Sequence, residues 1–284
     1  MRWGTERRLE FIESRLFWEG MVNRAHISDT FGISSQQASA DFARYMELAP
    51  GNTAYDRSRK GYIAAEGFRP VLSQPDAGRY LAQLRLVGDG AVPVDDIDLP
   101  LPPFDVVPGP VRRIEAGVLR AMLTAIRRHL AVEVLYQSMS KPEPSWRWIA
   151  PHALAHDGFR WHARAFCEKD RAFKDFVLAR TREMRATRAT SAAPAADLAW
   201  SERVRVIMGP HPGLSEGQRK AIESDYAMTG GVSVVDVRRC FLWYFLKRFG
   251  LDVDARQRRP QDQHIVLLND EDVLAALAGG RTDG

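Results

Sequence analysis

The chain has 284 residues, enough for two or three domains, and 45% of them are hydrophobic, as in ordinary globular proteins. Its net charge of +4 permits a nucleic-acid partner without demanding one, and its only cysteines, Cys167 and Cys240, exclude a disulfide framework or a cysteine metal cluster. The N-terminus lacks an apolar signal core and the longest apolar run, 240–246, is too short to span a bilayer, so we expect a cytoplasmic protein with no membrane partner.

Residues 1–70 carry the pattern of a helix-turn-helix. Apolar side chains at helical spacing predict helices over 6–17, 22–31 and 35–48. Gly32 ends the second helix, as glycine commonly does, and the serines that follow are good N-cap residues for the third. Helix, turn and helix in this order are typical of DNA-binding domains, although any three-helix domain would begin in the same way.

The third predicted helix has an apolar and a polar face. Its expected inward residues are Ala38, Phe42, Tyr45 and Met46, and its expected outward residues include Asp41. In a helix-turn-helix, the start of this helix enters the major groove, where a glutamine amide pairs with an adenine edge and a serine reaches phosphates or bases. We therefore expect DNA contacts from Ser34, Ser35, Gln36, Gln37, Ser39 and Arg44.

A basic hairpin follows the three helices. Two short strand-like pieces within 53–65 enclose a tip that carries Arg57, Arg59 and Lys60, which we expect to contact DNA phosphates or the minor groove. A basic hairpin in this position predicts a winged helix. Residues 1–70 hold ten Lys or Arg and nine Asp or Glu, so binding depends on local placement of charge.

Residues 71–115 read as a connector between domains. The stretch 76–87 predicts one helix, and 88–110 is rich in proline, glycine and aspartate, which predicts an extended, semi-stiff linker. The linker holds too many apolar side chains for a free tether. We expect it to lie either against a second subunit or against its own domain.

The next region, 116–190, predicts one helix followed by a small, strongly bent β-domain. A helix is expected at the start of the region, a hairpin turn at Asp157 and Gly158, and strands in between and after. The expected helix covers 116–129, and the expected strands cover 132–137, 146–156, 158–167 and 173–180.

The strand at 158–167 alternates in character. Its apolar row, Phe159, Trp161, Ala163 and Ala165, can lie on a core, and its other row is Arg160, His162 and Arg164. Two guanidinium groups beside an imidazole suit an anion such as a phosphate or a nucleotide. The alternative is an exposed polar face with no ligand.

Three segments of this region resemble the core of the WYL domain, an Sm-like barrel named for a Trp-Tyr-Leu tripeptide. They are W-I-A-P-H-A-L at 148–154, G-F-R-W-H-A-R-A-F at 158–166 and F-K-D-F-V-L-A-R at 173–180. In this chain Trp161, His162 and Ala163 stand at the tripeptide positions, so only the tryptophan is retained.

The resemblance extends to the regulator architecture of that family, and in particular to dimeric repressors found beside bacterial phage-defence operons. It implies a homodimer whose winged helices bind an inverted-repeat operator in double-stranded DNA, and a barrel that senses a nucleotide or nucleic-acid effector. By position, the residues that it places around the effector pocket are Ser138, His152, Arg160, His162, Arg164 and Arg180.

The C-terminal region, 200–284, mixes strands and helices. Strands are expected at 204–208, 232–237 and 264–268, with helices at 215–226 and 237–249 and a frayed end at 278–284. The resemblance implies a dimerisation role for this small α/β extension. The apolar helix 237–249 packs either in its own core or against a second chain. The whole is an α+β multidomain chain: winged helix, connector, barrel and extension.

Catalytic motifs are absent from the sequence, which has no G-x-S-x-G, P-loop, H-E-x-x-H or C-x-x-C. The seven histidines are scattered, so we expect no catalytic residues, no metal and no cofactor. The rival hypothesis is a nuclease or phosphodiesterase with a DNA-targeting winged helix, in which His152, His162 and nearby arginines cleave a phosphodiester.

Overall fold

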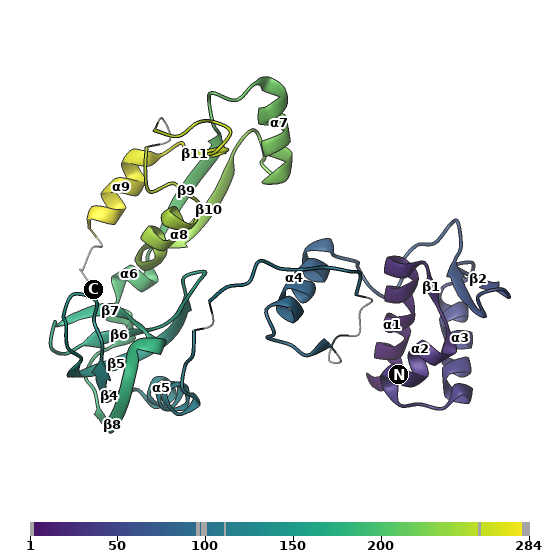
Figure 1. The fold of residues 1–284 in the computed structure, drawn as a ribbon, viewed down its shortest axis with the longest axis horizontal. Coiled ribbons are helices and arrows are strands. Elements are labelled where there is room, and N and C mark those ends of the chain that lie inside the picture. Colours follow the sequence, from purple (N-terminus) through teal and green to yellow (C-terminus); the bar gives the residue numbers. More distant parts are fainter. Residues whose placement is uncertain (1–2, 95–96, 98–100, 111, 255–256, 280–284) are drawn as a thin grey trace. The chain divides into compact units, whose positions relative to one another are not determined.

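The computed structural model describes residues 3–94, 97, 101–110, 112–254 and 257–279. The chain divides into two compact units, Met1–Pro110 and Val111–Gly284, called here the N-terminal and C-terminal units (Figure 1). The finer domain boundaries expected from the sequence stay predictions. Within the described residues, none of the helices combines the length and the apolar character that a membrane span requires.

The N-terminal unit is a winged helix. Its strands form one antiparallel sheet in the order β1-β3-β2, with helices α1, α2 and α3 before the β2–β3 hairpin and α4 after it. Its elements are α1 (Trp3–Glu19), β1 (Met21–Val22), α2 (Arg24–Phe31), α3 (Ser35–Leu48), β2 (Thr53–Asp56), β3 (Gly61–Ala64) and α4 (Ala77–Gly88).

Local side-chain chemistry sets the ends of α2 and α3. Asn23 caps α2 by accepting from the backbone N–H of His26, and Gly32 ends that helix in the left-handed conformation that suits glycine. Ser34 then caps α3 by accepting from the backbone N–H of Gln37. The predicted helix-turn-helix is confirmed, with α3 beginning and ending where the sequence indicates.

Two residues of α3 face the opposite way from the prediction. Asp41 is 2% exposed, because Arg8 of α1 donates two hydrogen bonds to its carboxylate, at 2.6 and 3.1 Å. Met46, expected in the core, is exposed. The sequence also gives no sign of β1, since Val22 reads as the start of a helix and the two residues of β1 become a strand only by pairing with β3.

A buried carboxylate anchors the chain after the wing. Glu13 of α1 is fully buried and accepts hydrogen bonds from the backbone N–H groups of Val71, Leu72 and Ser73 at 2.8–2.9 Å. The hydroxyl of Tyr45 on α3 donates to the same carboxylate at 3.2 Å. Glu13 therefore joins α1, α3 and the segment that leads to α4.

The C-terminal unit begins with a helix on a five-stranded antiparallel sheet of order β7-β6-β5-β4-β8. Edge strands β7 and β8 pair with β6 and β4 and, over the described residues, not with each other, so a closed Sm-like barrel is not confirmed. The elements are α5 (Ala116–Arg128), β4 (Leu130–Tyr136), β5 (Ser145–His156), β6 (Trp161–Cys167), β7 (Ala172–Val177), η2 (Leu178–Arg180) and β8 (Thr181–Ala189).

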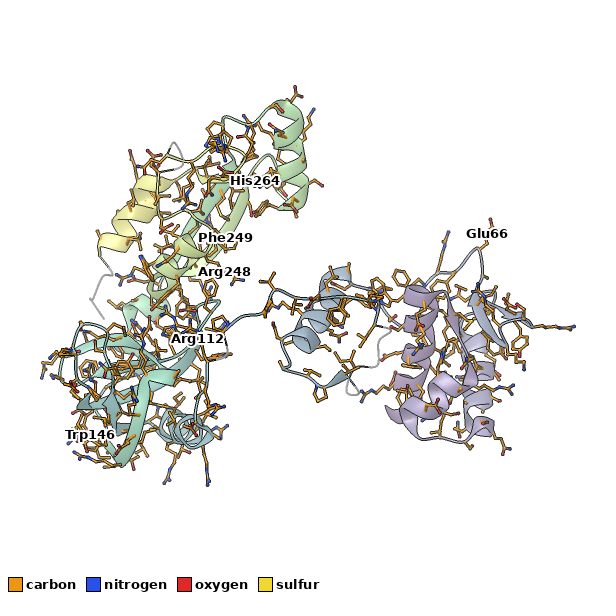
Figure 2. The ribbon with its side chains drawn as sticks, viewed as in Figure 1. Glu66, Arg112, Trp146, Arg248, Phe249 and His264 are labelled. Carbon is orange, nitrogen blue, oxygen red and sulfur yellow. The ribbon has the colours of Figure 1, made fainter. Side chains whose placement is uncertain are left out.

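Strand β8 is the main element that the sequence does not predict. Its residues are mostly exposed, so they lack the apolar alternation that marks a half-buried strand. Its long side chains reach across the sheet instead: Arg185 lies over the ring of Trp146 on β5, labelled in Figure 2, at 4.0 Å. The strand predicted at 173–180 is also shorter than expected, because the chain turns through η2 before β8 begins.

The remainder of the C-terminal unit is a three-stranded antiparallel sheet, β10-β9-β11, with helices around it. Its elements are η3 (Pro194–Ala196), α6 (Leu198–Ser201), β9 (Arg203–Pro210), α7 (Glu216–Asp225), β10 (Ser233–Arg238), η4 (Arg239–Phe241), α8 (Leu242–Arg248), β11 (Ile265–Leu267) and α9 (Asp270–Ala278).

The apolar helix predicted at 237–249 begins later, at Leu242. The residues before it belong to β10 and η4, because β10 pairs with β9 as far as Arg238. Leu242 and Leu246 are buried in the core of their own unit, as the first of the two alternatives expected. The sequence did not predict α9, and most of the expected frayed end, 280–284, lies outside the described residues.

Candidate functional site

The start of α3 presents exposed polar side chains, as predicted. Ser35 and Gln36 are exposed, and the hydroxyl oxygen of Ser34 caps the helix by accepting from the backbone N–H of Gln37. Gln37 is exposed but held, because its amide Nε2 donates to the carboxylate of Asp41 at 3.1 Å. Gln37 is therefore pre-oriented by a carboxylate that is itself fixed by α1, an arrangement that lowers the entropy cost of a base contact.

The other predicted contacts of α3 are partly engaged within the protein. Ser39 donates to the backbone carbonyl of Ser35 and accepts from Arg24 at 3.3 Å. Arg44 pairs with Glu47 at 2.8 Å. Arg24, which the sequence reading missed, is exposed beside α3 and is a further cation on this surface.

The wing exposes its three cations. Asp56 accepts hydrogen bonds from the backbone N–H groups of Ser58 and Arg59, which shapes the tip between β2 and β3. Arg57, Arg59 and Lys60 are exposed there, and Lys60 adopts a positive φ of 51°. The hairpin tip is thus a compact basic turn of the kind that a winged helix lays along DNA.

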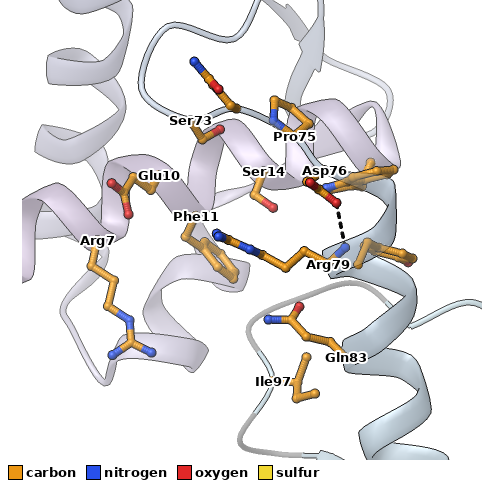
Figure 3. Close-up of a pocket in the computed structure, with 13 residues that line it drawn as sticks. Arg7, Glu10, Phe11, Ser14, Ser73, Pro75, Asp76, Arg79, Gln83 and Ile97 are labelled. Carbon is orange, nitrogen blue, oxygen red and sulfur yellow. Dashed lines mark hydrogen bonds between the residues drawn. The ribbon is translucent and has the colours of Figure 1, made fainter. Parts of the chain in front are cut away.

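A cavity of about 320 Å³ in the N-terminal unit lies between α1 and the segment leading into α4 (Figure 3). Its charged lining is balanced, with Arg7 and Arg79 against Glu10 and Asp76. None of the predicted DNA-contacting residues lines it. It therefore shows no preference for an anion.

Strand β6 differs from the predicted half-buried strand. Trp161 is 49% exposed, whereas His162 and Arg164 of the supposed outer row are 1% and 5% exposed. The row is covered because Asp197, in the segment before β9, and Tyr244 of α8 contact it. Two buried basic side chains require partners, and both have carboxylates.

A second cavity, of about 240 Å³, opens beside this row and is called here the cationic pocket. Six basic side chains and two carboxylates, Asp170 and Asp175, line it, together with aromatic rings. The basic residues are Lys141, Arg147, Arg160, Lys169, Lys174 and Arg180, and the aromatic ones are Tyr136, Phe176, Trp243 and Tyr244.

Two buried polar atoms in the lining of the cationic pocket have no partner in the described part of the chain. The buried Nδ1 of His162 and the buried Nε of Arg147 make no hydrogen bond. Because Nε2 of His162 donates to Asp157 at 2.9 Å, Nδ1 is left to accept from a ligand, or to donate once protonated. An anion with hydroxyl or amine groups would satisfy these atoms.

Asp157 holds one wall of the pocket in place. Its carboxylate accepts from His162, from the backbone N–H of Phe159 and from both the backbone and the side chain of Arg160. Burial by itself would raise the pKa of Asp157, but these hydrogen bonds hold it well below its usual range. The carboxylate stays charged and orients both basic residues.

Arg164 lies behind the pocket, between two carboxylates. It donates to Asp197 at 2.7 and 2.9 Å, and to Asp175 at 3.1 Å. Burial would raise the pKa of Asp197, but hydrogen bonds from His152 and Arg164 keep it well below normal, whereas burial raises the pKa of Asp175. Tyr244 of α8 completes the network by donating to Asp175 at 3.4 Å.

The predicted ligand residues thus fall into two groups. Ser138, Arg160, His162 and Arg180 line the cationic pocket, and no partner of the Arg180 guanidinium is found among the described residues. The other two do not line it. Arg164 reaches it only through Asp175, and His152 bonds to Asp197 at 3.0 Å.

Comparison with known proteins divides the chain in the same order as its architecture. Residues 4–86 match the family model of the BrxR transcriptional regulator winged helix-turn-helix domain, residues 117–186 that of the WYL domain, and residues 203–273 that of the BrxR transcriptional regulator C-terminal dimerization domain.

Relatives that match over almost the whole chain are also transcriptional regulators. The DNA-binding transcriptional repressor CapW of Pseudomonas aeruginosa is 41% identical over 96% of this chain and 91% of its own. The chain belongs to the CapW family of DNA-binding transcriptional repressors. The CapW of Escherichia coli (strain KTE188) is 39% identical over 97% of this chain and 93% of its own.

Among solved structures, the proteasome accessory factor B/C of Arthrobacter aurescens is 16% identical over 99% of this CapW-family chain. The chain covers about half, 49%, of that protein, and the TM-score of 0.27 is too low to support an argument.

The prediction from sequence left out many of the residues that form the pocket of this CapW-family repressor. Arg147, Lys174 and Asp175 come from strands whose alternation was visible, and Asp175 lies directly across from Arg164 on the neighbouring strand. Asp197 and Tyr244 gave no signal, since both reach the site from beyond β8. The relatives' names favour a regulator over the nuclease hypothesis.

Proposed function

We propose that this chain represses a phage-defence operon as a homodimer bound to an inverted repeat, and that a nucleotide or nucleic-acid fragment in the cationic pocket controls its release. The family resemblance supports the proposal that the repressed operon is a phage-defence operon. The observation that carries the effector is the pocket itself: six basic side chains against two carboxylates, with buried polar atoms left unsatisfied.

The DNA surface consists of the start of α3 and the wing. Two-fold symmetry of a dimer makes the operator an inverted repeat, with half-site centres about one helical turn, roughly 10 bp, or a multiple of it apart. The matched dimerization domain at 203–273 supplies the pairing of subunits.

Signal transmission from pocket to dimer runs through carboxylates. Asp175 lines the pocket, bonds to Arg164 and accepts from Tyr244 of α8. Arg164 in turn holds Asp197, at the entrance to the dimerization domain. An anion bound beside Asp175 changes the charge balance of this network, and it shifts the dimer only if one arrangement binds the anion better.

The first test concerns base reading by Gln37. Replacing Gln37 with alanine is expected to weaken binding to DNA from immediately upstream of the chain's own gene by about tenfold or more, because a bidentate amide–adenine contact is worth about 1–3 kcal/mol. Fluorescence anisotropy against that DNA and a scrambled duplex measures the difference. Equal losses on both DNAs would contradict direct readout, and absence of selectivity in the unmodified protein would overturn the operator assignment.

The second test concerns Arg180, whose guanidinium lacks a partner among the described groups. Arg180→Gln is expected to weaken the effector response by about 10- to 100-fold, because a charge-assisted hydrogen bond is worth roughly 1.5–3 kcal/mol. The readout is release of labelled operator by inorganic phosphate, a nucleoside monophosphate or a 5′-phosphorylated tetrathymidylate.

Arg182→Gln is the matched control, because Arg182 is two residues away, exposed and outside the pocket lining. Operator affinity without effector should be equal in both variants. Equal effector responses in the two would show that the cationic pocket is not the sensor.

A further inference from the structure

The unit that carries the winged helix has little charge with which to attract DNA. Residues 1–110 hold 12 Lys or Arg against 15 Asp or Glu, whereas residues 111–284 hold 28 against 21. Affinity for duplex DNA comes largely from cations that neutralise phosphates. The positive charge of this DNA-binding chain therefore resides mainly in the other unit.

Within the C-terminal unit, the excess of positive charge is concentrated at and just before α5. Residues 111–130 contain five arginines and a single acidic residue, Glu115. Arg120, Arg127 and Arg128 are exposed, and their spacing of seven and eight residues puts them on one side of the helix, called here the arginine face. The opposite side, with Met122 and Ala125, packs in the core of the sheet.

The arginine face is left without partners. Some exposed arginines elsewhere in this unit are neutralised, since Arg185 pairs with Glu133 and Arg188 with Glu168. No ion pair or hydrogen bond engages the guanidinium groups of the arginine face in the described portion of the chain. Attraction to the helix C-terminus accounts for Arg127 and Arg128, but not for Arg120 in the middle of α5.

The shape of the face fits an extended polyanion. Seven residues of α-helix span about 10 Å, so the guanidinium groups form a row, and not a closed cradle for one small anion. A DNA strand carries a phosphate every 3.4 Å along the helix axis, and each guanidinium presents a planar fork of donors to phosphate oxygens. The partner that charge complementarity favours is the DNA on which this family of repressors acts.

We propose that the arginine face of α5, Arg120, Arg127 and Arg128, contacts the phosphate backbone of the DNA that the winged helix binds. The contact is independent of sequence. It adds affinity and salt dependence to operator binding, whereas α3 and the wing supply the selectivity. This goes beyond the effector-controlled repression proposed above and does not depend on the identity of the effector.

The test replaces all three arginines with glutamine in the full-length dimer. Fluorescence anisotropy is measured with own-gene upstream DNA and with a scrambled duplex of the same length, between 50 and 200 mM salt. Losing three phosphate contacts per protomer should lower the slope of log K against log salt by about 2.7 per protomer, on both DNAs alike. Arg120→Gln alone, the milder variant should the triple variant fold poorly, should lower it by about 0.9 per protomer.

The control removes the same charge from elsewhere in the unit, as Arg182→Gln, Arg219→Gln and Lys220→Gln, all exposed positions off α5. An unchanged slope in the α5 variants, or an equal drop in the control, would overturn the proposal. The scrambled duplex keeps this test separate from the operator assignment, because a phosphate contact is measurable on it even if no selective operator is found.

Discussion

Replacing Arg164 with methionine is expected to lower the free energy of unfolding of the C-terminal unit by about 3–5 kcal/mol. Arg164 is buried between Asp197 and Asp175, and the substitution leaves Asp197, 1% exposed, with only His152 as a basic partner. A buried carboxylate that loses its guanidinium pays the cost of its desolvation without compensation. Urea denaturation followed by tryptophan fluorescence measures the change.

Two comparisons make this result specific. Arg185→Met removes an arginine that pairs with Glu133 on the exposed side of the same sheet, and it should cost far less because water screens that pair. Adding Asp197→Asn to Arg164→Met should recover part of the loss, since the amide still caps α6 without a buried charge. Equal losses from Arg164→Met and Arg185→Met would show that the buried network does not stabilise the unit.

The second large effect concerns Glu13 of the winged helix. Glu13→Ala is expected to destabilise the N-terminal unit by about 4 kcal/mol or more, because each hydrogen bond to a charged group is worth roughly 1.5–3 kcal/mol and an unsatisfied buried donor costs about 1–3 kcal/mol. The backbone N–H groups of residues 71–73 and the hydroxyl of Tyr45 all lose their acceptor. Urea denaturation and hydrogen exchange of these three amides measure the loss.

Glu10→Ala is the matched control, one helical turn earlier on α1 and exposed. It should change the stability by no more than about 0.5 kcal/mol. Glu13→Gln keeps one acceptor oxygen and should fall between the two. Unchanged exchange rates at residues 71–73 in Glu13→Ala would show that Glu13 does not hold the segment between the wing and α4 in place.

The sequence predicted which residue types form the candidate site, but not which of them are buried and paired with one another. Ser138, Arg160, His162 and Arg180 were assigned to a pocket by their positions in the family resemblance, and all four line one cavity. Arg164 was assigned with them for the same reasons. Its burial depends on Asp197, 33 residues further along the chain. No local sequence pattern indicates that these two residues come into contact.

The sequence by itself determined the local structure: the caps at Asn23 and Ser34, the glycine stop between α2 and α3, and the extended conformation of β6. These depend on contacts within about four residues, or on the two-residue repeat of a strand. Only the tertiary structure decided which charged groups are buried and paired. Tyr244 meets Asp175 across 69 residues, and Glu13 meets Ser73 across 60. Such partners are selected by packing and desolvation, which act between segments brought together by folding.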